Sequence, residues 1–352
     1  MDKKVLKAVT VFLGILTVLV CVTFPFFPKL HTYAVAAREA RETARANEHI
    51  TIKRQDPEKV VEADNSTSAQ LKIELPKGLT EQDISFENDY LDQTIYIRFP
   101  NGVDDYFADY SMSGSSDHIA GISYYKENGD GVIMMELDQV CELQDTVDSG
   151  YLYVNFIDPH EIYDKVVVID AGHGAKAVGA VKQGIYEKDI DLAIVLELKK
   201  ILDADTEDHI GVYYTRTDDS DPSLEKRVQL ANKANADLFI SVHNNSSASG
   251  KMSGMNGTQV LYSESDDSEL SSQRLAQICL DHVSSAFEST SIGLLPGDDI
   301  YIIRSSEVPV ALVEVGFMTN ADELAKLNSQ EYQAKAAEGI YEAIKQAFEE
   351  GY

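Results

Sequence analysis

The sequence predicts an α/β protein with a mixed, mostly parallel sheet flanked by helices, preceded by a small β-sandwich and an N-terminal transmembrane helix. An uncharged segment occupies the N-terminus, a period-two hydrophobic pattern follows, and after residue 164 apolar strands alternate with amphipathic helices. We therefore expect four parts: a membrane anchor (1–29), a stalk (30–68), a β-sandwich (69–160) and an α/β domain (165–350).

Composition excludes several classes of function. The chain has 352 residues with 30 basic and 59 acidic side chains, a net charge of −29 that would repel a phosphate backbone, so no nucleic acid is expected as a partner. Hydrophobic residues make up 44%, which is typical of a globular protein. None of the three cysteines lies in a CxxC pair, so a cysteine-bound metal is excluded. Spacing establishes no disulfide between Cys141 and Cys279, and we expect Cys279 to be a buried thiol on a helix.

The N-terminal segment is long enough to cross a membrane. Residues 8–28 carry no charge and follow Lys3, Lys4 and Lys7. The apolar stretch exceeds that of most signal peptides, which favours an uncleaved single-pass anchor with the rest of the chain outside the cytoplasm. The alternative is secretion after signal cleavage near Ala36.

Short strands are predicted in the first folded part, residues 69–160. Leu71, Ile73 and Leu75 alternate with Lys72 and Glu74, and similar alternation recurs over 95–99 and 151–156. An Asn-Gly pair at residues 128–129 predicts a hairpin turn. Since no helical pattern separates these strands, a small β-sandwich is expected. It contains no catalytic constellation, and a spacer or docking module remains as plausible as a polymer-binding domain.

The second part begins with the apolar strand 165–170, which runs into a glycine-flanked His173. A helix is predicted over 186–202, where Ile190, Ile194, Leu198 and Ile201 follow helical spacing. A second helix is expected over 223–235. Further buried strands are expected over 236–242 and 310–313, so these elements predict a sheet with helices packed against it.

Three polar side chains follow the three predicted strands. His243 and Glu314 come directly after a strand, His173 lies three residues beyond the first strand, and Glu187 opens the first helix. Ligands gather at the carboxyl edge of such sheets, and two histidines with one carboxylate suit zinc with one position open for water. A second carboxylate would move protons, and either glutamate can fill either role on this argument. Singly, each residue has a commoner structural explanation; only their combination favours a metal site.

Five motifs in a fixed order resemble the zinc-dependent N-acetylmuramoyl-L-alanine amidases of bacteria, over about residues 166–348. They are Val168-Ile-Asp-Ala-Gly-His-Gly174, Tyr186-Glu-Lys188, Thr215-Arg216, Ala236-Asp-Leu-Phe-Ile-Ser-Val-His-Asn-Asn245 and Val310-Ala-Leu-Val-Glu-Val-Gly-Phe-Met-Thr-Asn320. The resemblance implies a phosphorylase/hydrolase-like catalytic domain, with His173, Glu187 and His243 as Zn²⁺ ligands and Glu314 as the catalytic glutamate. Asn245 and Arg216 are then candidates for substrate binding, with structural support as the alternative.

The resemblance also implies an activity and a place. These enzymes cut the amide between N-acetylmuramic acid and the L-alanine of the peptidoglycan stem peptide, which places this chain at the bacterial cell membrane with its catalytic domain outside the cytoplasm. The β-rich segment is similar to AMIN-type targeting domains. Two alternatives stay open: a zinc peptidase acting on the stem peptide, and a non-catalytic wall-binding relative.

This chain departs from the family pattern at two places. Residues 175–178 lack the family's second glycine and Asp-Pro, and residues 291–293 replace a common Asn-Arg-Gly. Both changes are expected to reshape the substrate groove without removing a ligand. The segment 246–257 has room only for a short loop, so the autoinhibitory helix that some relatives insert there is expected to be absent.

Overall fold

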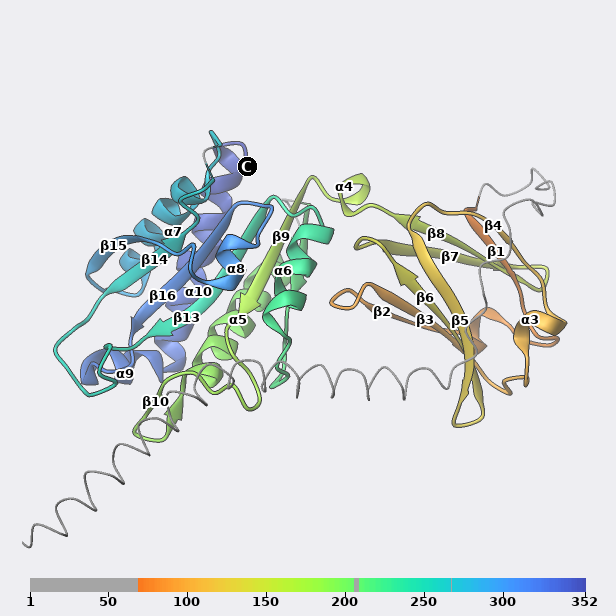
Figure 1. Ribbon diagram of the computed structural model, residues 1–352, viewed down its shortest axis with the longest axis horizontal. Helices are drawn as coiled ribbons and strands as arrows, with labels where there is room; N and C mark the ends of the chain where they lie inside the picture. The colour runs from red at the N-terminus through yellow and green to blue at the C-terminus, as the bar shows by residue number, and fades with distance from the viewer. Residues whose placement is uncertain (1–68, 206–208, 267) are drawn as a thin grey trace, which may run out of the picture.

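The computed structural model describes residues 69–205, 209–266 and 268–352, and Figure 1 shows two parts side by side. We call residues 69–157 the β-sandwich and residues 165–352 the α/β part. The expected anchor and stalk lie outside the described residues. Within the described residues, no helix has the length and apolar character needed to cross a bilayer.

The β-sandwich consists of two four-stranded antiparallel sheets around one apolar core. The first has the order β2 (Ser85–Asp89), β3 (Thr94–Phe99), β6 (Asp130–Leu137), β5 (Ile119–Glu127); the second has β4 (Met112–Gly114), β1 (Leu71–Glu74), β8 (Tyr151–Ile157), β7 (Glu142–Asp148). Leu71 and Ile73 are buried while Lys72 is half-buried, as the alternation predicts. The short helices η2 (Glu81–Asp83) and α3 (Tyr106–Asp109) were not expected.

The predicted hairpin turn joins β5 to β6. Asn128 and Gly129 have φ values of 55° and 97°. A two-residue hairpin turn of type I′ needs positive φ at both central positions, which asparagine and glycine tolerate best. The Asn-Gly prediction is therefore confirmed by the backbone.

The α/β part is built on a six-stranded sheet. Its order is β12 (Ile210–Tyr214), β9 (Lys165–Ala171), β13 (Leu238–Asn245), β16 (Val310–Phe317), β14 (Thr258–Tyr262), β15 (Ser291–Pro296). Neighbouring strands are parallel except for the antiparallel pair β14 and β16. The prediction of a mixed, mostly parallel sheet is confirmed.

Helices cover both faces of this sheet (Figure 1). One face packs against α5 (Glu187–Ala204), α7 (Ser272–Ala286), α9 (Ala321–Leu327) and α10 (Gln330–Glu349), and the other against α6 (Leu224–Lys233) and α8 (Tyr301–Arg304). Alternate residues of β9 supply the two cores, with Val167 and Ile169 toward α5 and Val166 and Val168 toward α6. Both faces are therefore apolar, which explains why the central strands read as continuous hydrophobic runs.

The β-sandwich packs against the side of the sheet that carries α6 and α8. Val140 of the sandwich is buried in the same cluster as Val166 and Val168, and its N–H donates to the carbonyl of Lys233 at the end of α6, at 2.9 Å. The hydroxyls of Tyr90 and Tyr213 both donate to Glu142, at 2.7 and 2.6 Å. A short helix, α4 (Pro159–Ile162), leads from the sandwich into β9.

Two strands run further than the sequence predicted. β13 extends to Asn245 and β16 to Phe317, so His243 and Glu314 lie within strands instead of just beyond them. The reason is that these strands pair with each other in register through the polar residues, with His243 opposite Glu314.

Both described cysteines, Cys141 and Cys279, are free and buried, and burial raises the pKa of each thiol to about 12. Cys279 lies on α7, so the expected buried helical thiol is confirmed.

Candidate metal centre

The first histidine lies in a tight loop after β9. His173 has a φ of 60°, in the left-handed region, and is followed by Gly174 with a φ of 143°. A Cβ added at Gly172 would lie 2.3 Å from Cε1 of His243, so only glycine fits at this position. The imidazoles of His173 and His243 consequently approach closely, with ring centroids 4.8 Å apart.

Glu187 lies between the two imidazoles. The hairpin of β10 (Val181–Lys182) and β11 (Ile185–Tyr186) leads directly into α5, whose first residue is Glu187. Its Oε1 is 3.0 Å from Nε2 of His173 and 3.2 Å from Nδ1 of His243, while Oε2 accepts the N–H of Ala180 at 2.7 Å. Burial opposes its ionisation, but the two imidazoles outweigh burial and hold the pKa of this carboxyl far below its usual value. The anion therefore has one oxygen aimed where two ring nitrogens converge.

Glu314 reaches the same place from β16. It is the register partner of His243 on one side and of Gln259 on the other. Its Oε2 is buried without a hydrogen-bond partner among the described residues, and burial raises the pKa of this carboxyl to about 7. Burial lowers the pKa of His243, but its hydrogen bond with Glu187 and the surrounding carboxylates outweigh this effect and raise the value to about 9.

These residues fit a divalent cation. Ligand atoms of His173, Glu187, Asp191 and His243 lie within 4.8 Å of one another, and in the described ranges this is the single such group of histidine, cysteine or acidic residues. A buried oxygen of Asp191 also has no hydrogen-bond partner there. Imidazole nitrogens and carboxylate oxygens are common zinc ligands, and buried oxygens without a protein partner suit a site that binds a cation.

The two expected substrate-binding residues are placed differently. Arg216 is buried, and its guanidinium group donates to the backbone carbonyls of Ala171, Gly172, Lys188 and Asp218. It therefore supports the loop that carries His173. This placement favours the supporting role that the sequence left open. Asn245 is half-buried at the end of β13, and its side-chain amide donates to Gln259 at 3.2 Å, beside Glu314.

Sequence reasoning missed a buried ionic network beneath the metal cluster. Asp170 accepts hydrogen bonds from Arg227, Thr215 and Ser241, each at 2.6 Å. Arg227 also donates to the carbonyls of Ala171 and His173. Burial disfavours the Asp170 anion, but Arg227 and the two hydroxyls outweigh it and lower the pKa of this carboxyl. The sequence signal for this network was Asp170, an acidic residue at the end of an otherwise apolar predicted strand.

Asp191 was missed as well. It lies four residues after Glu187 on α5, a spacing that puts both carboxylates on one helix face. From sequence alone Asp191 has an ordinary explanation, since an acidic residue near the N-terminus of a helix complements the helix dipole.

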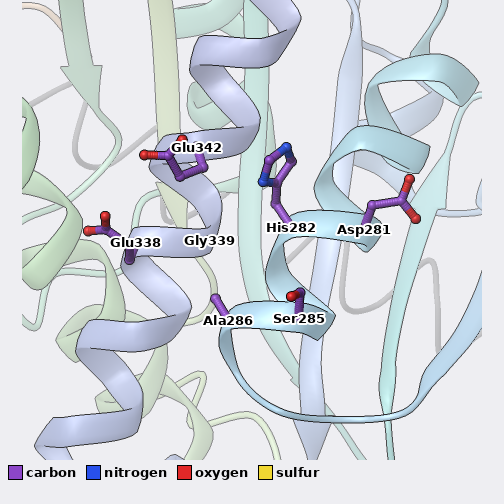
Figure 2. Close-up of a pocket in the computed structure, with 7 residues that line it drawn as sticks. All are labelled: Asp281, His282, Ser285, Ala286, Glu338, Gly339 and Glu342. Carbon is purple, nitrogen blue, oxygen red and sulfur yellow. The ribbon is translucent and has the colours of Figure 1, made fainter.

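A separate pocket lies between α7 and α10. Figure 2 shows His282 of α7 directed into the space between the helices, with Glu342 and Gly339 of α10 opposite. His282 Nε2 contacts Oε1 of Gln346 at 2.7 Å. None of the candidate metal ligands lines this pocket. His282 therefore lies in the α/β part but outside the metal cluster.

Comparison with known proteins places the cluster in a family context. Residues 167–346 match Amidase_3, described as N-acetylmuramoyl-L-alanine amidase, and this range includes His173, Glu187, His243 and Glu314. The uncharacterized protein YqiI of Bacillus subtilis is 37% identical over 189 residues, which are 54% of this chain and 87% of YqiI. The germination-specific N-acetylmuramoyl-L-alanine amidase of Bacillus subtilis is 30% identical over 200 residues, covering 53% of this chain and 81% of that enzyme.

Among solved structures, the catalytic domain of CwlV, an N-acetylmuramoyl-L-alanine amidase from Bacillus (Paenibacillus) polymyxa, shares 37% identity with a TM-score of 0.48. The alignment covers 53% of this chain and 98% of that domain.

Proposed function

Since the chain belongs to the N-acetylmuramoyl-L-alanine amidase family, we propose that it hydrolyses the amide between N-acetylmuramic acid and the L-alanine of the peptidoglycan stem peptide, with zinc at the cluster described above. The observation that carries the proposal is the convergence of His173, Glu187 and His243 on one point next to Glu314. Three protein ligands leave a fourth zinc position for water or substrate.

The side chains divide the work of the reaction. His173, Glu187 and His243 hold the metal, and Arg216 and Arg227 fix the loop that carries His173. Zinc, when bound, supplies a Lewis acid and makes water available as a nucleophile at neutral pH. Glu314 takes a proton from the attacking water and delivers it to the L-alanine nitrogen as the C–N bond breaks. A carboxyl whose pKa is about 7 exists in both protonation states near neutral pH, which suits this transfer.

The N-terminal segment and the β-sandwich are proposed to place the enzyme at the cell envelope. We propose that residues 1–29 anchor the protein in the membrane of the bacterial cell, with the hydrolase outside the cytoplasm. We further propose that the β-sandwich acts as an AMIN-like domain that brings the enzyme to the envelope. Removal of residues 1–29 should shift the protein from the membrane fraction to the soluble one with its hydrolase activity kept. If the full-length and truncated proteins divide equally between the membrane and soluble fractions, residues 1–29 are not an anchor.

Product analysis tests the activity. Purified muropeptides are incubated with the full-length protein, with and without a chelator, and the products are identified by mass spectrometry. The expected products are free stem peptides beginning with L-alanine and muropeptide sugars with a free lactyl carboxyl group, and the chelator should suppress both. Cleavage within the stem peptide would indicate the zinc peptidase instead. Binding to peptidoglycan without any new product would indicate a non-catalytic relative.

A further inference from the structure

One buried carboxylate of the α/β part is only half satisfied. Asp191 is 0% exposed; its Oδ1 accepts the side-chain amide of Asn244 at 2.7 Å, and its Oδ2 has no hydrogen-bond partner among the described residues. Asp170 provides an internal comparison, because it is equally deep, at 1% exposed, and is satisfied by an arginine and two hydroxyls. Burying a carboxyl group without such partners is expensive, so Oδ2 of Asp191 is an atom that a bound cation would stabilise.

The position of Asp191 points to the source of that charge. It is a member of the cluster whose ligand atoms lie within 4.8 Å of one another. Asp191 is also linked to the proposed ligands through Asn244. This asparagine directly follows His243 in β13, and the backbone N–H of Asn244 donates to Oε1 of Glu187 at 3.2 Å. Asp191 therefore holds the residue that connects two of the three proposed ligands.

Charge balance supports the same assignment. With neutral imidazoles at His173 and His243, the anions of Glu187 and Asp191 offset the two positive charges of a divalent ion, and Glu314 remains free for proton transfer. Such balance strengthens binding of the cation, because both carboxylates are buried and their electrostatic interactions are weakly screened.

We propose that Asp191 is a positioning residue of the metal centre: its charge holds the divalent ion, its contact with Asn244 orients His243 and Glu187, and it destabilises the protein when the metal is absent. This inference rests on the zinc centre of the proposed function. It predicts two effects of opposite sign for a substitution that removes the charge alone, whereas a purely structural aspartate would give a single loss of stability.

Asp191→Asn makes the test, because it keeps the oxygen that accepts from Asn244 and removes the charge. Two quantities are measured on full-length protein: the Kd for Zn²⁺ by competition with a chromophoric chelator, and the Tm of the metal-free form. We expect zinc binding to weaken by about tenfold or more, as for other residues that support metal ligands. We expect the Tm of the metal-free form to rise by about 2 °C or more, because the substitution removes the cost of burying an acid group whose Oδ2 has no hydrogen-bond partner among the described residues.

Two further variants separate charge from orientation. Asp189→Asn removes an exposed charge of the same helix turn, one paired with Lys188, and should leave both quantities unchanged. Asp191→Ala removes charge and hydrogen bond together, so its zinc affinity should fall below that of Asp191→Asn and its metal-free Tm should be lower.

The outcomes distinguish this inference from the proposed function. Unchanged zinc affinity in Asp191→Asn, or a lower metal-free Tm, would overturn the role of Asp191. A wild-type protein that binds no zinc would overturn both proposals. A wild-type protein that binds zinc but releases no amidase product would overturn only the proposed function, and the two opposite shifts in Asp191→Asn would still support this inference.

Discussion

The hydroxyl of Tyr213 in the α/β part donates a hydrogen bond to Oε1 of Glu142 in the β-sandwich, at 2.6 Å. The other oxygen of Glu142 accepts from Tyr90, whose ring packs edge-on against that of Tyr213 with centroids 4.9 Å apart. Because α6 lies beside this contact and carries Arg227, the sandwich supports the element that fixes the His173 loop.

Glu142→Ala should lower the stability of the protein. Two tyrosine hydroxyls would lose their acceptor, and Tyr213 is buried, so we expect a loss of about 1–3 kcal/mol in the free energy of unfolding. Denaturant unfolding measures the loss, with the exposed Glu136→Ala on β6 as control. A midpoint equal to that of the control variant would argue against a stabilising contact between the two parts.

Glu314→Gln should abolish turnover and keep the metal. The amide cannot accept the proton of water, so we expect kcat to fall by about 10²–10⁴, the usual contribution of a general acid–base group. Turnover and zinc content are measured on the same sample, with exposed Glu225→Gln on α6 as control. Full activity in Glu314→Gln would reject its proposed role.

The same substitution should flatten the pH dependence of the metal-free protein's stability. The pKa of Glu314 rises from 4.5 to about 7 on folding, so between these values the native state binds the proton more tightly than the unfolded state. Stability therefore falls as pH rises from about 4.5 through 7, by about 3 kcal/mol from this group. His243 continues the trend from 6.5 to about 9. Thermal unfolding at pH 5.5 and 7.5 should show a smaller difference for Glu314→Gln, and equal differences in both proteins would contradict the buried position of this carboxyl.

His243→Ala should lose both zinc and activity, because one of three proposed ligands is removed. His282→Ala is the matched control, since His282 lies in the pocket between α7 and α10 shown in Figure 2. Metal analysis should find one zinc per chain in the control and far less in His243→Ala. One zinc per chain in both variants would place the metal elsewhere.

Arg227→Met should strongly destabilise the α/β part. Arg227 is 2% exposed and pairs with the buried Asp170, so its removal leaves an uncompensated charge, at a cost of about 3–5 kcal/mol. In a double-mutant cycle with Asp170→Asn, the combined loss should be smaller than the sum of the single losses. Additive losses in denaturant unfolding would show that the two side chains do not act as a pair.

Much of the fold could be predicted because its signals are local. Period-two alternation in β1, β3 and β8, the Asn-Gly turn and the helical spacing in α5 each depend on a few neighbouring residues. The strands β12, β14 and β15 were not predicted. They are short, and β12 and β15 are the edge strands of the sheet, so their sequences carry weaker hydrophobic patterns.

The proposed ligands were found from sequence because His173, Glu187, His243 and Glu314 each lie in a recognisable motif next to a strong element. The residues that support these ligands were not found from sequence. Arg216 reads as a candidate contact for substrate until its four carbonyl partners are seen, and Arg227 reads as an ordinary helix residue. Whether a charged side chain faces solvent or a buried partner depends on elements distant in the chain.

The sequence by itself determined the fold class, many of the helices and strands, the family and the four residues expected to carry the chemistry. The tertiary structure alone decided that His243 and Glu314 face each other across neighbouring strands, that Asp191 is buried with an unsatisfied oxygen, and that Glu142 joins the two parts. The physical reason is that local patterns depend on residues close in sequence, whereas strand register, burial and charge pairing arise only when distant segments pack together.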